Sequence, residues 1–438
     1  MEKVSRYLCY PSLSQFTPEI SGLHDEEWLS LVTPGAEVGL YIHVPFCEQL
    51  CWFCSCRTQA VRCRSQVSDY VGSLVREIRW MAEQVPGDLV VRRIAMSGGS
   101  PMVMSAGDVG FICNSLRENM NVASEVDFSV EVDARRSDPW AIETFVSQGM
   151  NRATLSVQDF DQDVQLAIGR LQSEETTRKV VENLRAAGVG NVGIDVLYGL
   201  PRQTQDNVRK TVEAVVAMAP DRISLQGYAH VPWMAKRQRM IDERDLPMGE
   251  ARQAQYETAF DLLSAAGYRP VGIEHFARDG DPLLDLAHSG KLRRRHLAYT
   301  DDRLEAVIGI GASAVSSFRH GRVQNEQCTK AYRAQVDQGR SAAYRGTMLS
   351  LEDKVRGRAI EMLVCSFGVD LVALKAEFGD FSNIVRPGLE AATEKFGARI
   401  RWDSDGFRIV ERGPALARRV ARCLDPLHRE AQRYSYAI

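Results

Sequence analysis

The sequence predicts an α/β fold built around a (β/α) barrel, complete or partial, with a helical domain after it. Two observations predict this class. From Gly39 onward, short β-branched or apolar runs alternate with longer amphipathic stretches. Each strand-helix-strand unit is also long enough for a right-handed crossover between parallel strands, and such units in series form a barrel. The length of 438 residues leaves room for a further domain.

The barrel pattern contains six expected strands and five expected helices. The strands lie near 39–44, 93–97, 126–133, 152–158, 191–198 and 222–229. The helices lie near 66–85, 106–120, 138–149, 174–188 and 204–218. Beyond them we expect a long helix over 245–267, a strand over 268–278 and a glycine-rich buried segment over 306–315.

Three parts follow from these patterns: a leader over 1–38, the barrel with its extension over 39–345, and a C-terminal domain over 346–438. Composition favours a loosely ordered leader. In the last part, amphipathic helices precede two short strands around an Asp-Gly turn in 399–410, which indicates a winged-helix-like domain. Because the chain is acidic overall, we expect this domain to act as a lid or to face substrate, not to bind DNA.

Composition and charge exclude several classes of protein. The net charge of −3 gives no electrostatic basis for binding nucleic acid or an anionic membrane. We see no apolar run near the roughly 18 residues of a membrane span, and no signal peptide. Of ten cysteines, five lie between Cys47 and Cys63, which suits a reducing interior. We therefore expect a cytoplasmic protein.

Three cysteines follow the first expected strand closely. Cys47, Cys51 and Cys54 have the spacing C-x3-C-x2-C, and thiolates so spaced can hold three corners of an iron–sulfur cube. Cys56 is only two residues further on and points away from its neighbour in extended chain. The pattern favours a [4Fe-4S] cluster with one iron open to a small molecule. Zinc is the alternative, but the second ligand pair of a structural zinc site is missing.

The other strand ends also carry polar or glycine-rich groups, where a barrel places its chemistry. They are Ser97–Pro101, Glu131 with Asp133, Gln158 with Asp159, Asp195, and Tyr228–His230. An open iron at such a mouth suits chelation by the amino and carboxylate groups of S-adenosylmethionine. Gly98 and Gly99 let the backbone approach a ligand closely.

The segment Tyr41–Cys56 resembles the cluster motif of the oxygen-independent coproporphyrinogen III oxidases, a radical S-adenosylmethionine family. The resemblance covers nearly the whole chain, through the leader (Arg6-Tyr7 and Tyr10-Pro11) and through Ser129–Asp133, Ser156–Phe160, Asp195–Pro201, Tyr228–Pro232 and His275–Arg278. The fold it implies is a partial (β/α)6 TIM-type barrel with an N-terminal leader and a mostly helical, winged-helix-like C-terminal domain.

The resemblance also implies site residues. Cys47, Cys51 and Cys54 would ligate the cluster. The first S-adenosylmethionine would contact Tyr41, Phe53, Gly98, Gly99, Ser100, Glu131, Gln158, Arg170 and Asp195. A second one would lie near Cys56, Ala229 and Val315. Without the family, the acidic residues could instead be structural hydrogen bonds or caps, and Arg170 a solvated helix residue. His230 and His275 could be proton donors or porphyrin contacts, or satisfied buried histidines.

The reaction implied is oxidative decarboxylation of two propionates of coproporphyrinogen III to give protoporphyrinogen IX in haem biosynthesis. A 5′-deoxyadenosyl radical would abstract hydrogen. The implied partners are the tetrapyrrole substrate and a reducing electron donor of flavodoxin or ferredoxin type, and we expect a monomer.

Two departures from the family pattern keep alternatives open. Ser97 stands where the family has glycine, and His296 with Leu297 stands where it has an aromatic residue and an amide beside the second S-adenosylmethionine. Losing a ligand-bonding amide costs about 1–3 kcal/mol. One alternative is a diverged radical enzyme acting on another tetrapyrrole or another substrate. The other is a non-catalytic haem-binding or haem-delivery protein, with His296 as the candidate haem ligand.

Overall fold

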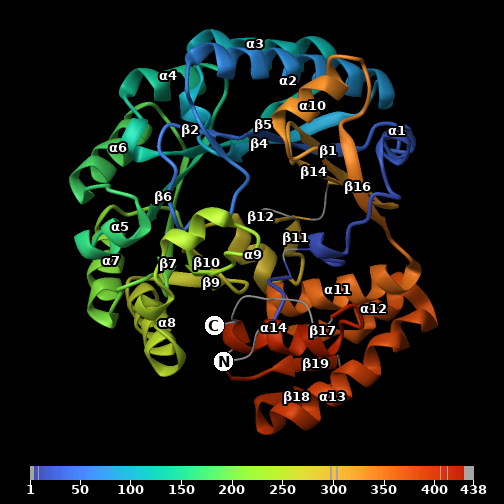
Figure 1. Cartoon of the computed structure of the whole chain (residues 1–438). Coiled ribbons are helices and arrows are strands. Elements are labelled where there is room, and N and C mark those ends of the chain that lie inside the picture. Colours follow the sequence, from blue (N-terminus) through green and yellow to red (C-terminus); the bar gives the residue numbers. More distant parts are fainter. Residues whose placement is uncertain are drawn as a thin grey trace.

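The computed structural model describes residues 4–428, without 8, 296–297, 302–303, 405 and 412. Twelve strands in this part form one sheet, in the order β16-β15-β14-β13-β1-β4-β5-β6-β7-β8-β10-β9. Seven neighbouring strands in the middle are parallel: β13 (Ala306–Ile310), β1 (Glu37–Val44), β4 (Val90–Gly98), β5 (Asn121–Val132), β6 (Arg152–Gln158), β7 (Asn191–Tyr198) and β8 (Arg222–Gly227). Figure 1 shows them as a curved, open wall.

Helices cover the outer face of this wall (Figure 1). They are α2 (Arg64–Gln84), α3 (Ala106–Asn119), α4 (Pro139–Ser147), α5 (Gln162–Ile168), α6 (Glu174–Ala186), α7 (Gln205–Ala217) and α8 (Gly249–Ala265). Several begin where the side chain of Ser or Thr caps the first turn, as Ser105 does for α3. Helices on the face explain why β1 is buried along nearly its whole length. The expected six strands and five helices are confirmed within a few residues.

The two edges of the sheet differ from the simple expectation. The strand expected over 268–278 is two antiparallel strands, β9 (Tyr268–Val271) and β10 (His275–Arg278). The chain turns at Gly272, where φ is +59° and a Cβ would lie 2.2 Å from the hydroxyl of Tyr299. The segment over 306–315 likewise divides into β13 and β14 (Val315–Ser317), and β15 (Gly321–Asn325) and β16 (Ala343–Met348) continue the edge. Antiparallel strands therefore extend both edges of the parallel block.

The C-terminal region contains α11 (Leu351–Ser366), β17 (Gly368–Asp370), α12 (Leu371–Phe378), α13 (Arg386–Phe396), β18 (Ile400–Trp402), β19 (Gly406–Ile409) and α14 (Gly413–Cys423). Its strands pair antiparallel in the order β17-β19-β18. Helices beside a small sheet agree with the winged-helix-like expectation, although Asp405 of the expected turn lies outside the described residues. Within the described ranges, no helix combines the length and the apolar character needed to cross a membrane.

The leader is not the loosely ordered segment that composition favoured. Tyr7 and Tyr10 are 3% and 5% exposed and belong to the same hydrophobic cluster as the core of the C-terminal region. The Tyr7 hydroxyl donates to Asp425 Oδ2 at 3.0 Å, and Arg322 donates to the carbonyl of Tyr10 at 2.7 Å. Burial of two aromatic rings supplies what local composition could not reveal. α1 (Gly22–Ser30) then leads into β1.

Candidate functional site

A cavity of about 210 Å³ lies at the carboxyl ends of the parallel strands. All three cysteines of the C-x3-C-x2-C pattern line it. So do ten other residues expected at the site: Phe53, Cys56, Gly98, Gly99, Ser100, Glu131, Gln158, Arg170, Asp195 and Ala229. Tyr41 and Val315 lie outside the lining. The structure thus brings together residues from six different strand ends.

The cysteine loop is held from both sides of the cavity. It runs between β2 (Phe46–Cys47) and β3 (Gln59–Ala60), which pair parallel to each other. The amide of Trp52 donates to the carbonyl of Ile168 at 2.8 Å, and Gln238 Nε2 donates to the carbonyl of Phe53 at 2.7 Å. These bonds keep the loop folded over the strand ends, with its thiols toward the cavity.

The three thiols suit a cluster better than a single ion. In the part of the chain that the structure describes, no three His, Cys, Asp or Glu side chains converge closely enough to hold one metal ion. A cubic cluster places each thiolate on a different iron, so its ligands need only face the same space. The donor set, three cysteine sulfurs at one cavity, fits a [4Fe-4S] cluster with one open iron.

Close packing around Gly98 and Gly99 leaves no room for a side chain at either position, independently of any ligand. Gly98 has φ +111°, and a Cβ there would lie 2.3 Å from the His43 ring. A Cβ on Gly99 would lie 2.4 Å from the carbonyl oxygen of Phe46. The Ser97 hydroxyl donates to the Tyr41 hydroxyl at 3.2 Å, so the added side chain does not line the cavity.

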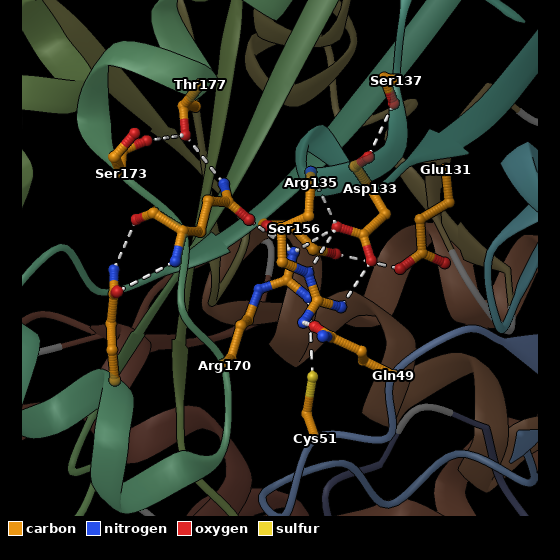
Figure 2. Close-up of polar contacts among 12 residues, drawn as sticks. Gln49, Cys51, Glu131, Asp133, Arg135, Ser137, Ser156, Arg170, Ser173 and Thr177 are labelled. Atoms are coloured by element: carbon orange, nitrogen blue, oxygen red, sulfur yellow. Dashed lines mark hydrogen bonds and ion pairs between the residues drawn. The ribbon is translucent and has the colours of Figure 1, made fainter.

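Arg170 is the best-anchored cation of the site (Figure 2). It is 5% exposed and donates to Asp133 Oδ1 at 3.2 Å, to Gln172 Oε1 at 2.8 Å and to the carbonyl of Ser156. Its Nη1 lies 3.7 Å from Cys51 Sγ. The side chain therefore places positive charge beside a cluster cysteine, which excludes the solvated helix arginine as its role.

Asp133 fixes two arginines at once. Arg135 donates to both of its carboxylate oxygens, at 2.9 and 2.6 Å, while Arg170 shares Oδ1. Burial would raise the pKa of Asp133, but hydrogen bonds from Arg135 and the charge of Arg170 outweigh it and lower the pKa. Asp133 is thus an ionised anchor, whereas we had assigned only its neighbour Glu131 to the site.

Glu131 and Asp195 are half-buried acids whose pKa shifts in the opposite direction from that of Asp133. Burial raises the pKa of Glu131, against a 3.0 Å hydrogen bond from the Ser156 hydroxyl. Burial, together with the charge of Glu131, raises the pKa of Asp195 to about 7. A nearby cation would lower the pKa of both carboxyls again and so favour their ionised forms. This favours a ligand-binding role over a structural cap.

Two neutral polar atoms of the cavity lining have no hydrogen-bond partner among the described residues. They are the Oγ of Ser100 and the Oε1 of Gln158, and both are buried. Gln158 also has φ +76°, a left-handed conformation that side chains rarely adopt outside functional sites. Buried polar atoms are normally paired, so both indicate a polar ligand.

Tyr41 and Val315 do not line the cavity. The Tyr41 hydroxyl bonds to His43 Nδ1 at 2.9 Å and accepts from Ser97. Burial lowers the pKa of His43 to about 4, so this histidine is neutral. Val315 is 5% exposed in β14, and its backbone would lie 2.8 Å or less from a Cβ on Gly309, the partner of Tyr41 across the sheet.

The two histidines considered for proton transfer have structural surroundings. His230 lies between the Tyr228 hydroxyl at 2.9 Å and Glu243 at 3.2 Å. His275 packs edge-on against Tyr299, and burial lowers its pKa to about 3. Neither lines the cavity.

The described residues on either side of His296 and Leu297 do not line the cavity. Arg293–Arg295 forms β11, which pairs with β12 (Ala298–Thr300) and contacts α11. The guanidinium of Arg294 stacks on the Tyr299 ring at 4.6 Å and lies 3.4 Å from Glu274. His296 and Leu297, the residues that depart from the family pattern, lie outside the described residues.

Several residues that line the cavity were not assigned to the site from the sequence: Arg6, Asp133, Arg135, Ser156, Gln226 and Arg237. Asp133 had a usable signal, because it ends an expected strand. Arg6 belongs to the leader segment that resembles the family, whereas nothing in the local sequence of Arg237 indicates that it lines the cavity.

Comparison with known proteins agrees with the geometry. Residues 41–215 match the radical SAM superfamily. The oxygen-independent coproporphyrinogen III oxidase of Cereibacter sphaeroides is 39% identical over 99% of this chain and 96% of its own, and that of Paracoccus denitrificans is 38% identical over 100% and 97%. The structure of coproporphyrinogen III oxidase (HemN) from Escherichia coli, a radical SAM enzyme, superposes with a TM-score of 0.90 at 29% identity, covering 97% of this chain and 100% of that one.

These likenesses confirm the predicted fold class and the predicted kind of enzyme, a radical S-adenosylmethionine oxidoreductase with a [4Fe-4S] cluster. They extend over the leader and the C-terminal region as well as the barrel. The chain belongs to the oxygen-independent coproporphyrinogen III oxidase family.

Proposed function

We propose that the protein catalyses the oxygen-independent oxidative decarboxylation of two propionate side chains of coproporphyrinogen III, giving protoporphyrinogen IX in haem biosynthesis. One observation carries the proposal: three cysteine thiols share a single cavity with buried polar atoms that have no partner in the described part of the protein. The two relatives reported above are named for this activity, and this chain matches nearly their whole length.

In this proposal, Cys47, Cys51 and Cys54 would hold the cluster, and S-adenosylmethionine would bind beside it in the same cavity. When bound, the two cofactors supply a 5′-deoxyadenosyl radical that removes a hydrogen atom from a propionate. The propionate then loses carbon dioxide, and an external acceptor takes the remaining electron. Each cycle converts one propionate into a vinyl group.

The wall of the cavity would bind the first S-adenosylmethionine. Arg170, held by Asp133, keeps positive charge beside Cys51 and would stabilise the thiolate. Glu131 and Asp195 offer carboxylates to a cationic amine or to ribose hydroxyls. Ser100 Oγ and Gln158 Oε1 would gain the hydrogen bonds that they lack. Phe53, Gly98 and Gly99 would line the same molecule, with Tyr41 supporting them from behind.

A second S-adenosylmethionine would lie at the outer part of the cavity, beside Cys56 and Ala229. Val315 would act only indirectly, because it does not line the cavity. Leu297→Gln, which restores the amide typical of the family, tests this site. We expect the variant to bind a second equivalent of S-adenosylmethionine more tightly in calorimetry. Unchanged stoichiometry and affinity would remove Leu297 from the argument.

The remaining parts of the proposal concern partners and location. The tetrapyrrole would lie across the cavity mouth, and a flavodoxin or ferredoxin type of donor would reduce the cluster. We propose a cytoplasmic monomer. Gel filtration with light scattering tests the oligomeric state, and a dimer mass would contradict it.

An anaerobic assay tests the central proposal. Reconstituted protein is mixed with reductant, S-adenosylmethionine and coproporphyrinogen III, and products are followed by mass spectrometry. Loss of two carboxyl groups, with 5′-deoxyadenosine formed in step, is the expected result. Deoxyadenosine without a decarboxylated tetrapyrrole would indicate a diverged radical enzyme with another substrate. Absence of both products, with retained haem binding, would favour haem delivery.

A further inference from the structure

Arg237 is a cavity-lining cation with no carboxylate partner in the described part of the chain. It lies in the 3-10 helix η4 (Lys236–Met240), which follows β8. The other arginines of the wall each have an acidic partner: Arg135 and Arg170 contact Asp133, and Arg6 contacts Glu274. Among the arginines that line the cavity in the described part of the chain, Arg237 alone has no carboxylate within ion-pair distance.

Only half of the Arg237 guanidinium is used by the protein. Its Nη2 donates to the carbonyl of Cys56 at 2.9 Å and to the Thr58 hydroxyl at 2.8 Å. Its Nη1 is buried, and no hydrogen-bond partner for it occurs in the residues the structure describes. A buried N–H of a charged group without a partner is unfavourable, so this donor is expected to find one in a ligand.

The backbone that carries Arg237 is fixed before any ligand arrives. The next residue, Gln238, is fully buried and donates to the carbonyls of Phe53 and Ala229 at 2.7 and 3.1 Å. Its Oε1 also accepts from the amide of Val231 at 2.5 Å. These bonds tie η4 to the cysteine loop and to the end of β8. A donor held in place in this way loses little freedom on binding.

We propose that Arg237 binds a carboxylate of a molecule held in this cavity. The inference rests on the proposed function, which supplies two carboxylate sources: a propionate of the tetrapyrrole, and the carboxylate of S-adenosylmethionine in the outer part of the cavity. A planar guanidinium with free N–H groups matches the two oxygens of a carboxylate. An amide or hydroxyl ligand would leave the charge uncompensated.

The test compares a carboxylate ligand with its ester. Coproporphyrin III and its tetramethyl ester are titrated by fluorescence into the anaerobically reconstituted enzyme and its Arg237→Gln variant, and S-adenosylmethionine is titrated by calorimetry. If the carboxylate belongs to the tetrapyrrole, the variant loses about 10- to 100-fold in affinity for the free acid and none for the ester. If the carboxylate belongs to S-adenosylmethionine, the variant loses about 10- to 100-fold in affinity for S-adenosylmethionine instead.

Arg239→Gln is the matched control, because Arg239 is exposed in the same helix and does not line the cavity. It should leave all three affinities unchanged. Unchanged affinity of Arg237→Gln for both carboxylate ligands, at full cluster content, overturns the inference. So does an equal loss for acid and ester. If the glutamine variant fails to take up the cluster, Arg237→Lys replaces it and is decided by the same ratio of acid to ester.

This design separates the inference from the function on which it rests. A wild-type enzyme that does not decarboxylate coproporphyrinogen III refutes the proposed function, whatever Arg237 does. An active wild-type enzyme whose affinities are unmoved in Arg237→Gln refutes the inference alone.

Discussion

Glu274→Gln should destabilise the protein more than any ordinary loss of an ion pair. Glu274 has a side chain 4% exposed and lies between three arginines from distant parts of the chain. Arg6 of the leader is 3.1 Å away, Arg294 of β11 is 3.4 Å away, and Arg418 of α14 also donates to it. Burial alone would raise the pKa of Glu274, but the charges of Arg418, Arg6 and Arg294 lower it.

The size of the destabilisation depends on the arginines that remain buried after the substitution. Glutamine keeps the shape and one acceptor, but Arg294 and Arg418, with side chains 6% and 8% exposed, lose their counter-charge. Removing one partner of a buried ion pair costs about 3–5 kcal/mol. Arg6 is 30% exposed and adds little. We therefore expect a loss of about 3–5 kcal/mol in the free energy of unfolding.

Urea unfolding at pH 7, followed by circular dichroism, measures this loss. Glu213→Gln is the control, because Glu213 pairs with Arg209 in a solvent-exposed i,i+4 contact, whose loss should change the free energy of unfolding very little. Since the folded pKa of Glu274 is lowered, its stabilisation is complete above the unfolded pKa of about 4.3 and is lost only as pH falls below it. The wild type should therefore exceed the variant by the same amount from pH 8 to about 5.

Two results would refute this reasoning. One is a cost for Glu274→Gln no larger than that of the control. The other is a difference between wild type and variant that already shrinks near neutral pH, since a lowered pKa cannot produce it.

Three further predictions concern the site itself. Cys51→Ser should abolish the visible absorption of the reconstituted cluster, whereas Cys56→Ser should retain it; equal spectra would overturn the ligand assignment. Because burial and a neighbouring carboxylate raise the pKa of Asp195 to about 7, ionising it costs stability as pH rises from about 4 to 7. Asp195→Asn should thus raise thermal stability at pH 8, by up to about 4 kcal/mol, and weaken S-adenosylmethionine binding in calorimetry; a less stable variant would contradict the sign. Gly98→Ala should cost about 1–3 kcal/mol in urea unfolding, since its φ is +111°, while Gly110→Ala, in open space on α3, should not destabilise.

Much of the fold and the cluster motif could be predicted because both depend on local sequence. An apolar run predicts a strand, and an amphipathic period predicts a helix. The alternation of these patterns over 39–218 therefore predicted the order of the elements. The cysteines lie within eight residues of one another, Cys47 to Cys54, and their spacing alone limits what they can bind. Polar residues at strand ends were expected to converge, because the carboxyl ends of parallel strands share one edge.

Residues within a strand were harder to assign, because successive side chains face opposite sides of the sheet. Tyr41 lies outside the cavity and makes its hydrogen bonds behind the wall, to His43 and Ser97. At the third strand end the sequence offered Glu131 and Asp133, and only Glu131 was assigned to the site, whereas Asp133 also lines the cavity and holds both arginines. The role of each polar residue at a strand end depends on where the strand ends and on which side chains from other elements contact that residue.

The sequence by itself determined the family of chemistry, since clustered thiols and an alternating strand–helix pattern are properties of neighbouring residues. The tertiary structure alone decided which distant groups share a charge. Arg6 and Arg418 meet at Glu274 across separations of 268 and 144 residues, and Arg237 reaches the loop of Cys56 across 181. Such contacts depend on how the packed sheet places leader, loops and C-terminal region, and no local preference encodes them. The place of Arg237 in the cavity, without a carboxylate partner among the described residues, is therefore a property of the fold.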